Sequence, residues 1–142
     1  MKILVDTCIW SYALRHDPNK QSRLVDLIIK ELQELLKEAR VVTIGPIIQE
    51  ILSGVKNEFQ FTKLKNVMRA FDEINITMDN YERAAELFNK CRTKGIQGSH
   101  IDFLICAISQ MHQLPIFTTD KDFQRYAQCI NLQFHSVRQT KE

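Results

Sequence analysis

The chain has 142 residues, of which 44% are hydrophobic and 25% are charged, and its formal net charge is +2. This composition is typical of one globular domain that buries its own core, so we expect a single domain over residues 1–142. It excludes a disordered chain, and the scarcity of glycine and proline (four and three residues) argues against an all-β protein. A net charge of +2 does not by itself indicate nucleic-acid binding, although it permits a local basic patch.

The first half of the chain alternates short apolar runs with helical patterns. The expected strands are residues 2–5 and 41–44, and the expected helices are residues 7–14, 22–39 and 58–71. Gly45-Pro46 opens a further helix, because proline at an early helical position loses no hydrogen bond, and Gly54 is its expected end. The helices between Gly45 and Phe71 are expected to form a projecting hairpin.

The second half continues the same alternation. The expected strands are residues 73–77, 115–118 and 132–135, and the expected helices are residues 79–92, 99–112 and 121–127. Asp79 and Glu82 have the spacing of a capping box. The helix over 99–112 is unusually apolar and is expected to be the most buried. Strands that alternate with helices predict an α/β fold with a mainly parallel central sheet of about four to five strands flanked by helices.

The four cysteines, Cys8, Cys91, Cys106 and Cys129, follow no CxxC pattern and have no histidine at zinc-ligand spacing. They lie in apolar or helical stretches, which predicts buried free thiols and a reducing, cytoplasmic location. The first residues, MKILVD, do not resemble a signal peptide. No apolar run approaches the roughly 20 residues of a membrane span, so we expect no membrane partner.

Four acidic residues, far apart in the chain, stand where this fold would bring them together: Asp6, Glu50, Asp102 and Asp120. Asp6 directly follows the first strand, and Asp120 follows a later one. Asp102 lies in the first turn of the most apolar helix, and Glu50 lies in the helix after the second strand. Ligands of parallel α/β sheets bind outside the carboxyl ends of the strands, so we expect the four acids to meet at one edge.

Each acid also has an ordinary structural explanation. Asp6 and Asp120 stand where a strand gives way to a helix, which is a common place for an N-cap. Asp102 has capping-box spacing from Ser99, and Glu50 alone is explained as a solvated helix residue. Two details favour a site. Apolar residues on both sides leave Glu50 only a narrow polar face, and a carboxylate in the helix of Asp102 is costly without a cation or donors.

Clustered carboxylates raise one another's pKa unless a cation compensates their charge. Oxygen ligands without a set of histidines or cysteines select Mg²⁺ or Mn²⁺. One bound metal lowers the pKa of a water to make a nucleophile, and a second, roughly 4 Å away, would stabilise the leaving oxygen. The four acids therefore predict a divalent-metal site suited to phosphodiester hydrolysis.

Four segments in this order, MKILVDTCIW, GPIIQEILSG, SHIDFLICAIS and IFTTDKDF, resemble the PIN-domain ribonucleases, and among them the VapC-type toxins of toxin–antitoxin pairs. The resemblance runs from residue 2 to about residue 135. It implies a PIN-like three-layer fold and a catalytic acidic quartet that binds metal. Asp6 and Asp102 would be direct ligands, Asp120 a direct or water-mediated ligand, and Glu50 a ligand or a base that orients water.

The resemblance also implies supporting residues and partners. Thr118 matches a small hydroxyl residue two places before the fourth acid, and Asp122 would be a supporting fifth acid or a cap. Thr7 is expected to make only local hydrogen bonds, and His100 to be structural. The implied partners are an RNA substrate, a small antitoxin and a second copy of the chain. The alternatives are a catalytically silent RNA- or protein-binding module, or a PIN nuclease of RNA processing without an antitoxin.

Several basic residues would steer phosphates toward the acids, or would simply form solvated helix faces. They are Lys56, Lys63, Lys65, Arg69, Arg92, Lys94, Lys121 and Arg125.

Overall fold

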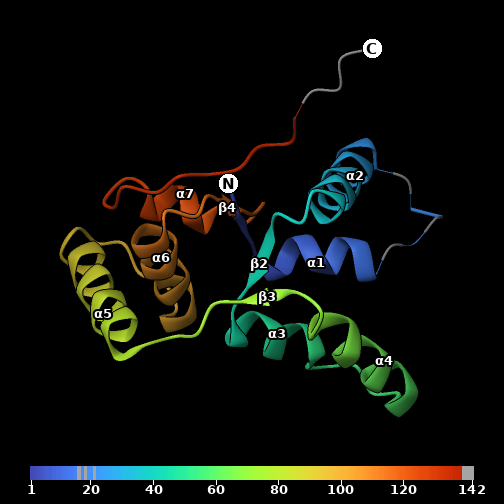
Figure 1. Cartoon of the computed structure of the whole chain (residues 1–142). Helices are drawn as coiled ribbons and strands as arrows, with labels where there is room; N and C mark the ends of the chain where they lie inside the picture. Colours follow the sequence, from blue (N-terminus) through green and yellow to red (C-terminus); the bar gives the residue numbers. More distant parts are fainter. Residues whose placement is uncertain (16, 18, 21, 139–142) are drawn as a thin grey trace.

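A four-stranded parallel sheet forms the centre of the protein in the computed structural model, which describes residues 1–15, 17, 19–20 and 22–138. Its strands are β1 (Ile3–Val5), β2 (Val41–Thr43), β3 (Asp72–Glu73) and β4 (Ile116–Phe117). They lie in the order β3-β2-β1-β4 (Figure 1). The predicted α/β fold with a parallel sheet is confirmed.

Helices flank this sheet on both sides and complete the three-layer arrangement. They are α1 (Thr7–Leu14), α2 (Arg23–Lys37), α3 (Gly45–Leu52), α4 (Glu58–Met68), α5 (Met78–Thr93), α6 (His100–His112) and α7 (Asp122–Tyr126). In Figure 1, α1 and α2 lie on one side of the sheet, α5 and α6 lie on the other, and α3 and α4 project as the expected hairpin. Among the described residues, no helix is long and apolar enough to cross a membrane.

The core forms where the apolar runs of the sequence meet. The three residues of β1 are at most 1% exposed, because helices cover both faces of a parallel sheet. Residues 103–109 of α6 are all buried, as its composition predicts. Cys91, Cys106 and Cys129 are buried free thiols, whereas Cys8 is only half-buried.

Three local predictions were wrong. The capping box of α5 is formed by Thr77 and Asn80 rather than by Asp79 and Glu82, because the chain turns into the helix earlier and buries the Asn80 side chain. The strand expected over 73–77 is the two-residue β3, an edge strand with β2 as its only neighbour in the sheet. The strand expected over 132–135 is reduced to a single bridge between Phe134 and Ile116, since β4 itself offers only two residues for pairing.

The last described segment is fastened to α2. Arg138 Nε donates to Oε1 of Glu31 at 2.9 Å, and Glu31 is only 5% exposed. Burial alone would raise the pKa of Glu31, but the hydrogen bonds and the charge of Arg138 hold it below its usual range. Arg138 therefore holds the segment before it against α2, in the helix layer on the side of the sheet opposite α5 and α6.

Candidate functional site

The order of the strands creates a crevice between β1 and β4. The chain leaves β1 toward β2 on one side and returns much later to β4 on the other side. In parallel α/β sheets, such a switch point opens a crevice at the carboxyl ends of the two strands. Asp6 directly follows β1, and Thr118 directly follows β4. The topology therefore brings Asp6 and Thr118, which are 112 positions apart in the sequence, to one place.

Asp6 is buried at this point, with 7% of its surface exposed. It caps α1 by accepting a 2.8 Å hydrogen bond from Thr7 N, and its Oδ2 accepts a 2.8 Å bond from Thr118 Oγ1. Burial raises the pKa of Asp6, these hydrogen bonds lower it in part, and the charge of Asp120 raises it again. Asp6 is thus both a helix cap and a buried carboxylate that is affected by the charge of another acid.

Asp102 faces the same place from the start of α6. Its backbone N–H donates to the Ser99 hydroxyl at 3.0 Å, so one half of the predicted capping box is present. Its side chain accepts a 2.6 Å hydrogen bond from Tyr126 Oη. Burial raises the pKa of Asp102, the Tyr126 bond opposes this rise, and the charges of Asp120 and Asp6 add to it. The three carboxylates therefore influence one another electrostatically.

Asp122 belongs to this cluster more closely than the sequence suggested. Asp102, Asp120 and Asp122 each offer one carboxylate oxygen, and these oxygens all lie within 4.8 Å of one another. Asp120 Oδ1 accepts a 2.9 Å hydrogen bond from Asp122 N, which fixes the turn into α7. Arg125 pairs with Asp122 at 3.3 Å, so this basic residue contacts the acids directly.

Glu50 approaches the cluster from α3 and is exposed. It shares a hollow of about 360 Å³ with Asp102. The other residues that line the hollow are Pro46, Gln49, Ser53, Ser99 and Ile101. Thr7 Oγ1 donates to Glu50 Oε2 at 3.0 Å, so the expectation that Thr7 makes only local hydrogen bonds was wrong.

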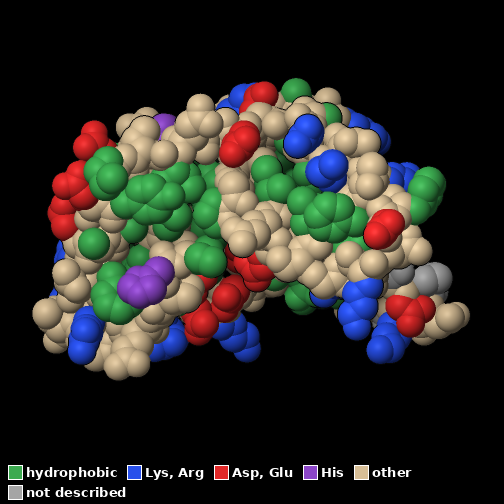
Figure 2. Space-filling view, turned by 90° about the horizontal axis from the view of Figure 1, so that it is seen from below, with side chains coloured by type: hydrophobic (Ala, Val, Ile, Leu, Met, Phe, Trp, Pro, Cys, Tyr) green, Lys and Arg blue, Asp and Glu red, His purple; other side chains and the backbone are tan. Residues whose placement is uncertain are grey.

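The structure thus brings the residues of the sequence-predicted site to one edge of the sheet. Figure 2 shows acidic side chains gathered where this face is indented between two lobes, with Lys and Arg side chains on both sides of the indentation. His100 stacks on Phe88 with ring centroids 5.0 Å apart, in keeping with a structural role. The sequence did not predict two residues that contact the acids. Tyr126 donates its hydroxyl hydrogen bond to Asp102, and the Cys8 thiol lies 3.6 Å from Asp6 Oδ2. An aromatic residue and a cysteine in apolar stretches carry no signal that separates them from the core.

The donors of this site suit a hard divalent cation. Asp102, Asp120 and Asp122 together offer three carboxylate oxygens, the ligands that Mg²⁺ and Mn²⁺ prefer. Two of the acids, Asp6 and Asp102, carry pKa values raised by burial and by neighbouring negative charge. Bringing such carboxylates together costs free energy that a bound cation would offset. The residues present therefore fit a metal centre.

Comparison with known proteins agrees with this geometry. Residues 3–128 match the PIN domain. The chain belongs to the PIN-domain family. The PIN-domain relatives Ribonuclease VapC11 of Mycobacterium tuberculosis (strain ATCC 25618 / H37Rv) and VapC ribonuclease Mb1587 of Mycobacterium bovis are each 30% identical to it over 140 residues, which is 96% of this chain and 99% of theirs. The predicted resemblance to VapC-type PIN ribonucleases is confirmed.

Solved structures share this PIN fold. VapBC2 from Rickettsia felis, bound to a DNA fragment from its promoter, superposes with a TM-score of 0.74 at 19% identity. The match covers 95% of this chain and 98% of that one. A toxin–antitoxin complex from Klebsiella pneumoniae gives a TM-score of 0.65 at 22% identity, covering 86% and 90%. At these identities, the likeness concerns the fold.

Proposed function

We propose that this PIN-domain protein is a Mg²⁺- or Mn²⁺-dependent endoribonuclease and the toxin of a toxin–antitoxin pair acting in the cytoplasm. The observation that carries the proposal is the convergence of carboxylates at the switch point between β1 and β4, where three acids offer oxygens within 4.8 Å of one another. The VapC ribonucleases to which the chain is similar support RNA as the substrate.

Each site residue has a distinct task in this proposal. Asp6, Asp102 and Asp120 hold the cation, and Asp122 supports them from the start of α7. Thr118 keeps the Asp6 carboxylate in place through its 2.8 Å hydrogen bond. When bound, the cation would act as a Lewis acid and would lower the pKa of a water molecule in the site. Glu50, which is exposed and held by Thr7, orients the attacking water and accepts its proton.

The proposed antitoxin needs a surface beside the acids. A groove of about 780 Å³ lies between α1, α3 and α4, and its lining includes the apolar residues Leu14, Ile51, Val55, Leu64 and Val67. Arg15, Lys56 and Lys63 stand on its rim. An acidic, amphipathic segment would suit both features. The structural relatives from Klebsiella pneumoniae and Rickettsia felis, described as toxin–antitoxin and VapBC assemblies, support an antitoxin as the partner.

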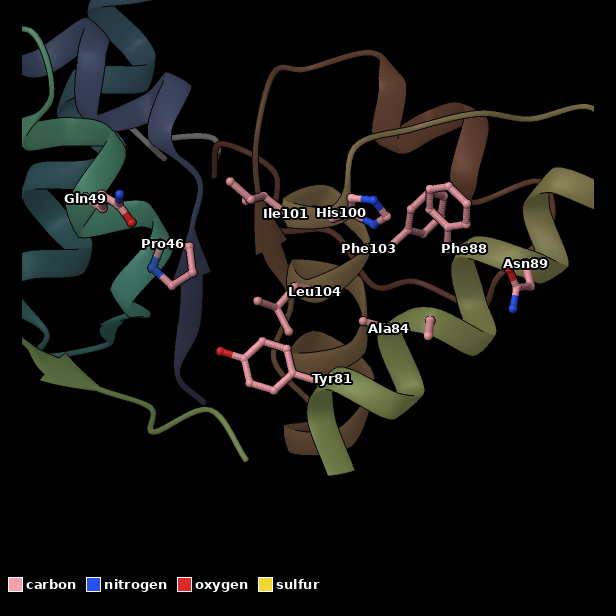
Figure 3. Close-up of a pocket in the computed structure, with 11 residues that line it drawn as sticks. Pro46, Gln49, Tyr81, Ala84, Phe88, Asn89, His100, Ile101, Phe103 and Leu104 are labelled. Atoms are coloured by element: carbon pink, nitrogen blue, oxygen red, sulfur yellow. The ribbon is translucent and has the colours of Figure 1, made fainter. Parts of the chain in front are cut away.

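A second copy of the chain is proposed to cover the surface where α5 and α6 meet α3. An apolar pocket of about 620 Å³ lies there between these helices and α3 (Figure 3). Figure 2 shows hydrophobic side chains gathered over this side of the molecule. Large exposed apolar side chains such as Tyr81 (51%) and Met78 (69%) are typical of protein interfaces. Pro46, Gln49 and Ile101 line both this pocket and the acidic hollow, so dimerisation there would place the two hollows close together.

The decisive experiment replaces single acids by asparagine. Asn caps a helix about as well as Asp, but it removes the charge that a metal ligand needs. We expect Asp6→Asn and Asp102→Asn to fold, to lose RNA cleavage in Mg²⁺ or Mn²⁺, and to relieve growth arrest on expression. A cognate antitoxin should also relieve that arrest.

The matched control is Asp79→Asn, which makes the same change at an exposed acid in the first turn of α5. It should cleave RNA as the wild type does. Full cleavage by both site variants would overturn the proposed mechanism. A wild-type protein that binds RNA without cutting it would instead favour a silent binding module.

A further inference from the structure

Tyr126 ends α7 inside the protein, 1% exposed, and its hydroxyl points at the acidic cluster. Oη donates to Oδ2 of Asp102 at 2.6 Å, which is the short distance typical of a hydroxyl bound to a charged carboxylate. The ring lies between Phe103, with centroids 4.7 Å apart, and Phe123, at 5.4 Å. Packing therefore fixes the ring, and the ring fixes the hydroxyl.

Gly98 closes the remaining side of this ring. A Cβ added at position 98 would clash with Tyr126 Oη and would lie 2.6 Å from ring atoms Cε1 and Cζ. Ordinary side-chain contacts are more than 3 Å long, so no residue other than glycine fits here unless Tyr126 moves. Gly98 thus makes room for the tyrosine just before α6, the helix that carries Asp102.

A hydrogen bond to one oxygen restrains the orientation of the whole carboxylate. The oxygen that Asp102 offers lies within 4.8 Å of those of Asp120 and Asp122, so its orientation determines the shape of the cluster. A single helix controls several of these groups, since α7 carries Asp122 at its first residue and Tyr126 at its last. Groups that orient metal ligands typically contribute 10-fold to 100-fold to metal affinity.

We propose that Tyr126 is a positioning residue for the metal site, that its hydroxyl orients Asp102 for cation binding, and that Gly98 provides the space it needs. The inference rests on the proposed function, because it assigns Asp102 to the metal. The competing explanation is a core tyrosine whose polar tip uses the nearest acceptor. Removing the hydroxyl while keeping the ring separates the two.

The test measures Mn²⁺ binding by electron paramagnetic resonance on the full chain. We expect Tyr126→Phe to weaken Mn²⁺ binding about 10-fold, and to recover most of its cleavage rate at high metal concentration. Asp79→Asn is the control, since it changes an exposed acid in the first turn of α5 outside the acidic hollow, and it should bind Mn²⁺ as the wild type does. Wild-type affinity in Tyr126→Phe, when Asp102→Asn binds weakly, would overturn the positioning role alone. Wild-type affinity in Asp102→Asn would overturn the proposed function as well.

A second measurement can overturn the proposal from the wild-type protein alone. Addition of Mg²⁺ to the wild-type protein should perturb the ultraviolet spectrum of a tyrosine whose hydroxyl is bonded to a metal ligand. Because Mg²⁺ itself does not absorb in this range, the change in the spectrum comes from the protein. The perturbation should remain in Asp79→Asn and vanish in Tyr126→Phe. A flat tyrosine difference spectrum on saturation of the wild type with Mg²⁺ would also overturn the positioning role.

Discussion

Thr7 Oγ1 donates a 3.0 Å hydrogen bond to Oε2 of Glu50, 43 residues further along the chain. The bond joins the first residue of α1 to the middle of α3. Thr7 also donates its backbone N–H to Asp6 Oδ1 at 2.8 Å, so one small residue contacts two of the acids of the proposed site. The relative placement of Asp6 and Glu50 therefore depends on Thr7.

The first prediction concerns this bridge. Thr7→Val keeps the shape of the side chain but leaves Glu50 without its donor. A net hydrogen bond is worth about 1 kcal/mol, and Glu50 is exposed, so we expect cleavage at limiting Mg²⁺ to fall about threefold to fivefold. The measurement is a Mg²⁺ titration of the cleavage rate. Thr7→Ser retains the hydroxyl and should behave as the wild type, and a Thr7→Val titration curve that overlays the wild-type curve would refute the role.

The second prediction concerns stability in the absence of metal. Asp6 and Asp102 have pKa values raised chiefly by burial, so their charged forms destabilise the folded protein at neutral pH. Asp102→Asn removes one such charge, and we expect it to stabilise the protein by on the order of 1 kcal/mol in EDTA. Urea denaturation of both proteins at pH 7 measures this difference. Asp79→Asn should show no gain, and an Asp102→Asn variant less stable than the wild type would contradict the prediction.

The same shifts fix the sign of the pH dependence. A carboxyl with a raised pKa binds its proton more tightly in the folded protein than in the unfolded chain. Asp6 and Asp102 should therefore add to the free energy of unfolding in EDTA as pH falls through their folded pKa values, and this gain is complete near the ordinary value of 3.8. Glu31, whose pKa is lowered from 4.5, and His135, whose pKa burial lowers from 6.5, act in the opposite direction as pH falls. Both groups are present in the wild type and in Asp102→Asn, so their effects cancel in a comparison of the two proteins. Denaturation curves measured from pH 7 down to pH 4.5 should therefore show the stability of the wild type increasing relative to that of Asp102→Asn as pH falls.

The third prediction concerns the apolar surface of α5 and α6. Ala85 is exposed and lines the pocket there, so Ala85→Arg places a charge in the proposed interface without disturbing a good helix position. We expect the wild type to sediment as a dimer and Ala85→Arg as a folded monomer. Glu82→Arg, a nearby exposed position on α5 outside the pocket, should remain dimeric. A wild-type protein that sediments as a monomer at micromolar concentration would refute this interface.

Much of this architecture could be predicted because strong periodicity extends over long segments. The helix over 7–14 was predicted to the residue, and α6 was predicted with Ser99 as its cap. The last strand could not be predicted as a single bridge, because apolar alternation over 132–135 does not reveal that β4 offers only two residues for pairing. Apolar patterns locate elements well, but the extent of pairing depends on neighbours far away in the chain.

For the candidate site, the sequence predicted the positions of the acids but not the side chains that hold them. The placement of Asp6 and Asp120 follows from strand ends, which sequence patterns locate. The contacts of Thr7 and Tyr126 do not, since they depend on how α3 and α7 pack after the sheet has formed. A tyrosine that packs against core phenylalanines looks the same in the sequence whether or not its hydroxyl contacts an acid.

The position of β4 beside β1 also sets the order in which the site can form. A chain emerges from the ribosome N-terminal end first, and β1, β2 and β3 all precede α5. The nascent protein can therefore assemble most of its sheet while the strand that leads to Asp120 is still missing. Under the proposed function, this order would leave the unfinished chain without a complete metal centre while it is still attached to the ribosome.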